Sequence, residues 1–183
     1  YKSQLDMYNF RYILRYKDYN FKFSTSKSVK DSSFYAFNTI YDMQSINNTV
    51  GFDIEKIIWR NKQSKLSIEA GIKTKHNENY LEEATLINRR LSIASIGLKY
   101  TTAIKKGILS LGFQYEKGLK NFGAEIDKNK IDKTPKAQFK KYNFSAMYYK
   151  PLTHNLISRT NIQASYSSDV LYSSERQTIG GIG

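Results

Sequence analysis

Few side chains in this sequence have the type and spacing that catalysis or metal binding requires. The two histidines, His76 and His154, lie far apart, in polar stretches that predict a loop and a turn. The adjacent carboxylates Glu82 and Glu83 are poor candidates for a proton-sharing pair, because neighbouring residues of an extended chain point in opposite directions. The absence of cysteine excludes thiol nucleophiles, disulfides and cysteine-based zinc sites. We therefore predict that the chain is not an enzyme and has no catalytic residue, cofactor or metal site.

Charge is the other chemical feature of the sequence. There are 29 Lys and Arg residues against 16 Asp and Glu, a formal net charge of +13, which raises nucleic acid as a partner. Lys140-Lys141 with Tyr142 and Phe144 could be read in that way. However, the basic residues are spread over every segment, with the densest group at 128–141, and no groove-reading helix is predicted. We expect them to face anionic lipid head groups or water, with no nucleic-acid partner.

The elements that position these side chains are predicted by an alternation of apolar and polar residues. In the first segment Tyr8, Phe10 and Tyr12 take one face, while Asn9 and Arg11 take the other. The pattern recurs at 19–24, 49–55, 66–73, 89–100, 109–116, 141–148 and 159–166. Each segment extends over about 9–12 residues, the length of a tilted strand that crosses a bilayer. No run approaches the roughly 18 apolar residues of a membrane-spanning helix.

One segment departs from the pattern. Between 89 and 100, Leu91 and Ile93 have one parity, whereas Ile96, Leu98 and Tyr100 have the other. A β-bulge near 94–95 would return all of them to one apolar face.

The connections alternate in length. Short ones are predicted near 17–18, 60–64, 101–106 and 151–155, and long polar ones near 28–43, 76–88 and 118–138. Outer-membrane barrels have this asymmetry, with short periplasmic turns and longer extracellular loops. The sequence therefore predicts an all-β fold, an antiparallel transmembrane β-barrel with about eight strands in this chain.

The two faces of the segments also differ as a membrane barrel requires. One face has almost no charge, as lipid contact demands, since a charge at mid-depth costs about 2–4 kcal/mol. The opposite face is polar and is predicted to line a water-filled lumen. The side chains expected there are Arg11, Arg15, Glu69, Lys73, Gln114, Arg159 and Gln163.

The end of the sequence carries a more specific motif, although its glycines alone would favour a surface turn. The pattern Leu-x-x-Ser-Glu-x-x-x-Ile-Gly-Gly is matched by Leu171, Ser174, Glu175, Ile179, Gly180 and Gly181. This stretch resembles the start of the conserved loop of two-partner secretion transporters, the haemolysin activator/secretion protein family. The segments 88–100 and 107–118 also resemble strands of that family. The Val-Arg-Gly-aromatic tetrad that follows the motif in the family is not in this sequence.

The resemblance implies a sixteen-stranded barrel in the bacterial outer membrane, preceded by two periplasmic POTRA domains. Family members export an unfolded exoprotein, usually a haemolysin or adhesin, without ATP. Residues 1–183 would then be a partial barrel domain that ends at the start of the conserved lumen loop, with the POTRA domains and closing strands outside it. The expected partners are that exoprotein and outer-membrane lipid and lipopolysaccharide. A small self-contained barrel, or a porin for passive solute passage, is the alternative.

Overall fold

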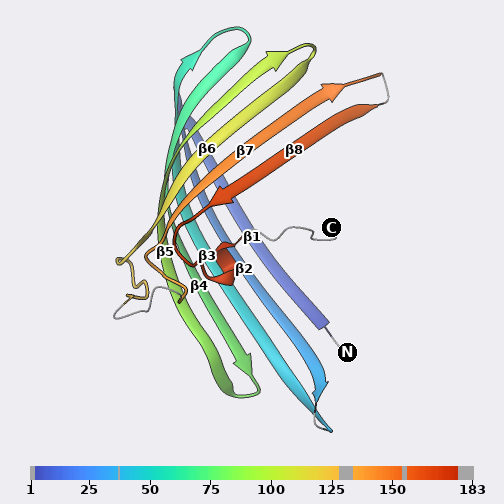
Figure 1. Cartoon of the computed structure of the whole chain (residues 1–183), viewed down its shortest axis with the longest axis vertical. Coiled ribbons are helices and arrows are strands. Elements are labelled where there is room, and N and C mark those ends of the chain that lie inside the picture. The colour runs from blue at the N-terminus through green and yellow to red at the C-terminus, as the bar shows by residue number, and fades with distance from the viewer. Residues whose placement is uncertain (1–2, 37, 128–133, 154–155, 177–183) are drawn as a thin grey trace.

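Eight antiparallel strands form a single curved sheet in the computed structural model, which describes residues 3–36, 38–127, 134–153 and 156–176 (Figure 1). Each strand pairs with its neighbours in the sequence. None of the described residues belongs to a helix long and apolar enough to cross a membrane. The strands are β1 Ser3–Tyr16, β2 Tyr19–Ala36, β3 Thr39–Arg60, β4 Ser64–Leu81, β5 Ala84–Ile104, β6 Gly107–Leu119, β7 Lys140–Pro151 and β8 Ile157–Tyr166, and a 3₁₀ helix η1 follows at Ser173–Glu175.

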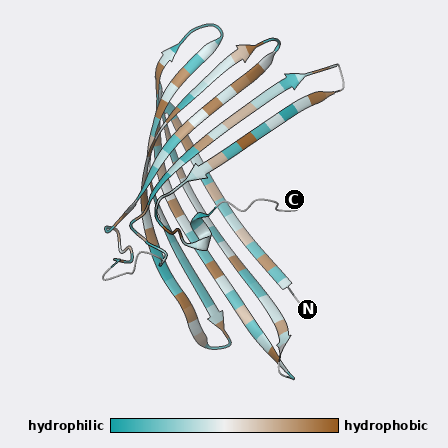
Figure 2. Cartoon of the chain, viewed as in Figure 1, coloured by the Kyte–Doolittle hydropathy of each residue, from teal (hydrophilic) through white to brown (hydrophobic). Residues whose placement is uncertain are grey.

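Strand register confirms the predicted separation of apolar and polar faces. Residues opposite each other in an antiparallel pair share a face, and one such row is Tyr12, Phe23, Phe52, Ile72 and Ala94 across β1–β5. Figure 2 shows the resulting alternation of apolar and polar residues along the strands. We call the face with this row the convex face. The opposite, concave face is the one over which η1 lies (Figure 1).

The sheet is open. β1 and β8 are its two edges, and no contact joins them within the part of the chain that the structure describes. These eight strands therefore form a half-barrel and not the closed eight-stranded barrel of the alternative prediction.

Two of the three predicted long loops are wrong. β2 and β3 pair without interruption as far as Ala36 and Thr39, and β4 and β5 as far as Leu81 and Ala84. The strands are therefore 10–22 residues long, and β1–β6 exceed the predicted 9–12, whereas β7 and β8 lie within it. Beyond the apolar belt a ladder needs only its backbone hydrogen bonds and β-compatible side chains, so the apolar alternation stops before the strand does. Only the third long connection, at 120–139, is confirmed.

The two ends of the sheet are consequently different. The short-turn end holds the connections at 17–18, 61–63, 105–106 and 152–156, close to the predicted positions. The long-hairpin end holds the extended β2–β3 and β4–β5 hairpins and the connection at 120–139 (Figure 1).

The predicted bulge near 94–95 is also wrong. β5 pairs with β4 and β6 without a register shift there, and the irregularities lie at Ile57/Trp59 and Asn79/Tyr80. Leu91 and Ile93 therefore point to the concave face, where they are 1% and 2% exposed. Their apolar character reflects a cover on that face, which is described below.

The turn at 105–106 predicts a stabilising substitution. Lys105 and Lys106 have φ of 47° and 65°, the left-handed region that type I′ hairpin turns require and that Asn-Gly adopts at lower cost. Combined Lys105→Asn and Lys106→Gly changes should stabilise the folded protein by about 1 kcal/mol. The measurement is the temperature at which the full-length protein loses its folded gel mobility.

Lys62→Gly is the matched control, because Lys62 lies in another short turn and its φ is not positive. It should give no gain. An equal gain from Lys62→Gly would contradict the explanation by φ.

Candidate functional site

All seven residues predicted to line a lumen lie on the concave face. Arg15, Glu69 and Gln114 belong to one cross-strand row, and Arg11 and Lys73 belong to another. Gln163 lies opposite Ser145 and Arg159 opposite Tyr149, with the same parity. The structure brings four of the seven around one open hollow of about 510 Å³, namely Glu69, Gln114, Arg159 and Gln163.

The charges of this face compensate one another near the short-turn end. Glu55 is 5% exposed and lies 3.3 Å from the Nζ atom of Lys22 and 3.2 Å from that of Lys65. The same Lys22 lies 3.2 Å from Glu69, and Asn20 donates to Glu55 at 3.0 Å. Three neighbouring strands, β2, β3 and β4, are thus linked by one mixed-sign network.

A buried apolar cluster covers the concave face of β5, and sequence reasoning missed it. Leu91 packs with Ala137 and Tyr172, while Ile93 packs with Phe139 and Leu171. Burying a Leu or Ile side chain contributes about 1.5–3 kcal/mol. The change of parity at 91–93 was the sequence signal of this cover, because apolar side chains on a face open to water would not be buried.

The aromatic ring in this cover is also held by charge. The Arg89 guanidinium lies 3.6 Å from the centroid of the Tyr172 ring, a cation–π contact. The Tyr172 hydroxyl donates to Glu125 at 3.3 Å, and Glu125 in turn lies 3.8 Å from Arg89. The connection 120–139 and the C-terminal segment are therefore tied to β5 together.

Hydrogen bonds from two side chains to the backbone close the base of the connection 120–139. The Asp127 carboxylate accepts from the N–H groups of Ala137 and Gln138 at 3.0 and 2.7 Å. The Gln138 amide donates to the carbonyls of Leu119 and Glu125. Gly118 donates to Phe139 O at 2.9 Å, and a Cβ at Gly118 would overlap the Ala137 carbonyl oxygen.

The segment 167–176 follows β8 and folds onto this cover as an inner strap (Figure 1). Asp169 accepts from the backbone of Lys140 at 3.0 Å and lies 3.4 Å from the Lys136 Nζ atom. The Lys136 N–H donates to Val170 O at 2.9 Å. Leu171 and Tyr172 then enter the buried cluster.

Glu175 holds the inner strap against β4 and β7. Its side chain is 3% exposed, and its carboxylate accepts from Lys75 on β4 at 2.6 Å and lies 3.9 Å from Lys141 on β7. The Lys141 Nζ atom also lies 2.8 Å from the carboxylate of Glu116 on β6. Of the six motif residues, the structure therefore places Leu171 and Glu175 against the concave face, and Ser174 donates to Glu175 at 3.4 Å. Ile179, Gly180 and Gly181 lie outside the described residues.

The structure places one of the two histidines first considered for chemistry. His76 is not in a loop, as predicted, but on β4, 3.0 Å from Asn88 and 3.2 Å from Glu78. His154 lies outside the described residues. Within those residues, no group of three His, Asp or Glu side chains is placed to hold a metal ion.

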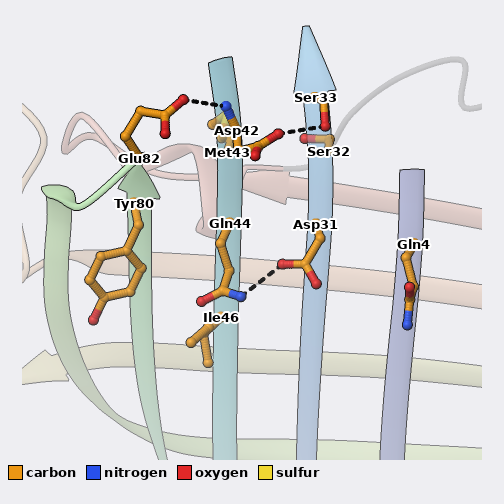
Figure 3. Close-up of a pocket in the computed structure, with 10 residues that line it drawn as sticks. All are labelled: Gln4, Asp31, Ser32, Ser33, Asp42, Met43, Gln44, Ile46, Tyr80 and Glu82. Carbon is orange, nitrogen blue, oxygen red and sulfur yellow. Dashed lines mark hydrogen bonds between the residues drawn. The ribbon is translucent and has the colours of Figure 1, made fainter. Parts of the chain in front are cut away.

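Another hollow, of about 630 Å³, lies at the long-hairpin end and holds three acidic side chains (Figure 3). Asp42 accepts from Ser33 at 2.6 Å, Asp31 accepts from Gln44 at 2.8 Å, and Glu82 accepts from the Asp42 N–H at 2.8 Å. The first two bonds lie within the β2–β3 hairpin, and the third connects that hairpin to the β4–β5 hairpin, which gives the acids a structural role. Glu82 lies in the two-residue turn between β4 and β5.

The sheet is a half-barrel with an apolar convex face and a polar concave face, and the inner strap lies against the concave face. These features are those of the wall of a transmembrane β-barrel with an internal segment. The chain belongs to the family of haemolysin secretion/activation proteins ShlB/FhaC/HecB, whose pattern it matches over residues 1–182. Like the outer membrane transporters of this family, it is located in the bacterial outer membrane.

The outer membrane transporter CdiB of Dickeya dadantii (strain 3937) is 28% identical over 172 residues, covering 93% of this chain and 31% of that protein. CdiB of Escherichia coli O6:K15:H31 (strain 536 / UPEC) is 28% identical over 166 residues, covering 90% and 28%. The chain thus spans about a third of these relatives.

Two solved structures have a similar fold. CdiB from Escherichia coli superposes with a TM-score of 0.92 at 25% identity, over 97% of this chain and 34% of that one. CdiB from Acinetobacter baumannii gives 0.80 at 16% identity, over 98% and 32%, which is a likeness of fold.

The first site prediction concerns Glu175. Glu175→Gln should loosen the inner strap, because removing one partner of a buried ion pair costs about 3–5 kcal/mol. In the full-length protein, hydrogen exchange of the amides in 167–176 should accelerate at least tenfold. Glu83→Gln, an exposed turn residue, is the control and should have no effect. Unchanged exchange in Glu175→Gln would show that this carboxylate does not hold the strap.

The second prediction contrasts two glycines of the concave face. Gly118→Ala should destabilise the fold by about 2 kcal/mol, since the methyl group meets backbone that cannot move aside. Gly51→Ala should cost much less, because its Cβ would lie 3.0 Å from the rotatable Ser24 hydroxyl. Equal shifts in the thermal unfolding of the two variants would refute the close approach at Gly118.

Proposed function

We propose that the protein containing this chain is the outer-membrane transporter of a two-partner secretion system, which exports an unfolded haemolysin- or adhesin-type exoprotein. The observation that carries the proposal is the polar concave wall with its own strap folded against it, in a chain of this family. The convex face of the same strands is apolar, as lipid contact requires.

In this proposal the concave face, with the seven residues named above, is the wall that the exoprotein passes. Part of its charge is compensated within the wall, as the Lys22–Glu55–Lys65 and Lys141–Glu116 contacts illustrate. The hollow near Glu69 is also lined by Gly97 and Gly112, which present no side chain. These properties suit an extended chain of varied sequence.

The inner strap is the start of the conserved lumen loop in this proposal. Leu171, Ser174 and Glu175 bring the chain onto the wall, and the motif residues Ile179, Gly180 and Gly181 lie outside the described residues. A passive porin needs an unobstructed lumen, so a strap fixed by a buried carboxylate favours a regulated passage. No catalytic step forms part of the proposal, and no nucleic acid is a partner.

Orientation follows from the two ends of the sheet. The short-turn end faces the periplasm and the long-hairpin end faces the outside, as in other outer-membrane barrels. Residues 1–183 are one part of a larger barrel whose further strands pair with the edges β1 and β8. POTRA domains would lie on the periplasmic side, and outer-membrane lipid and lipopolysaccharide would surround the convex face.

A photo-crosslinking amino acid placed at Gln114 or Gln163 should capture the exoprotein during secretion. The same group at the neighbouring convex positions Phe113 and Ile162 should capture none, because they face lipid. The measurement is the exoprotein adduct of the full-length transporter in cells that secrete. Adducts of equal yield from both faces, or none from the concave face during active secretion, would contradict the proposed path.

A further inference from the structure

A tyrosine row marks the border of the apolar belt on the convex face. Tyr115, Tyr142 and Tyr166 lie directly opposite one another on β6, β7 and β8. Their rings are 5.2 and 6.5 Å apart, centroid to centroid. Amphipathic aromatic rings gather where hydrocarbon meets head groups. The row therefore places this interface on β6–β8, on the side of the long-hairpin end.

Exposed cations lie just beyond this row. Lys117 and Lys140 are the next convex residues on β6 and β7, and they lie directly opposite each other. Lys120 follows β6, and Arg90 is held beside the same connection by the bond from Glu125 N to Arg90 O at 2.8 Å. All four side chains are exposed. We call Arg90, Lys117, Lys120 and Lys140 the cationic rim.

The cationic rim lacks the acidic partners that four lysines of the concave face have. On the concave face Lys22, Lys65, Lys75 and Lys141 each lie within 4 Å of a carboxylate. No such ion pair is found for the four rim residues within the described part of the chain. The nearby acids are engaged elsewhere, Asp169 with Lys136 and Glu125 with Arg89.

Like charges directly opposite each other on a sheet are destabilising, so the Lys117–Lys140 pair calls for an external anion. The Lys117–Lys140 pair lies two residues beyond the tyrosine row, at the depth of the lipid head groups. Lysine side chains extend their amines to that depth. At the long-hairpin end, the phosphates there are those of the outer leaflet.

We propose that the cationic rim binds the phosphate groups of lipopolysaccharide. The inference rests on the orientation given under the proposed function. It makes the rim a lipid site on the outer wall, separate from the concave path of the exoprotein.

The test measures binding of lipopolysaccharide to the purified full-length protein in detergent by native mass spectrometry. Lys117→Gln with Lys140→Gln should weaken binding about fivefold per lysine, hence roughly twenty-five-fold for the pair. The matched control is Lys105→Gln with Lys106→Gln, which removes the same charge at the short-turn end and should leave the affinity unchanged. Equal losses in both pairs, or no loss in either, would overturn the proposal.

A second arm uses phosphatidylglycerol in place of lipopolysaccharide. Weak binding that is indifferent to the rim substitutions supports lipopolysaccharide as the partner, whereas equally strong rim-dependent binding would overturn that identity. Folded gel mobility checks that each variant is intact. Exoprotein secretion by the rim variants should persist, so a failure of the lipid site and a failure of the proposed transport are read separately.

Discussion

The backbone of a strand in hydrocarbon has no water to bond with, so each N–H and C=O group needs a partner within the protein. Seven antiparallel ladders satisfy this requirement inside the sheet, but the outward groups of β1 and β8 are left open. In the membrane these edges must pair with further strands. Among the described strands two edges therefore remain unpaired, and the chain spans about a third of each CdiB relative.

Because lipid takes one face, all interactions that could control passage are confined to the other. Three sets of contacts on the concave face hold the connection 120–139 and the inner strap together. They are the buried cluster around Leu91 and Phe139, the hydrogen bonds of Asp127 and the contacts of Glu175. The apolar contacts hold Leu171 and Tyr172 against β5, whereas the buried Glu175 carboxylate joins the strap to β4 and β7. An ion pair is suited to such a role, because its stability depends strongly on geometry and is lost when one partner moves.

The sequence was sufficient for the strand number and the two faces, because a period of two is imposed by lipid on one side and water on the other. It was insufficient where neither solvent imposes a pattern. The strand ends at Ala36 and Leu81 lie beyond the apolar belt, where ladders continue on polar residues. The burial of Leu91 and Ile93 came from residues about 45 or more positions later, such as Phe139 and Tyr172, which no local pattern reports.

The central claim is that the two faces of each strand meet different solvents. Spin labels placed singly at positions 49–55 of β3, in the full-length protein in a bilayer, test it by their accessibility to oxygen and to a water-soluble nickel complex. Oxygen should dominate at Val50, Phe52 and Ile54, and nickel at Thr49, Gly51 and Asp53. Uniform nickel access along the strand, or the opposite alternation, would contradict the account.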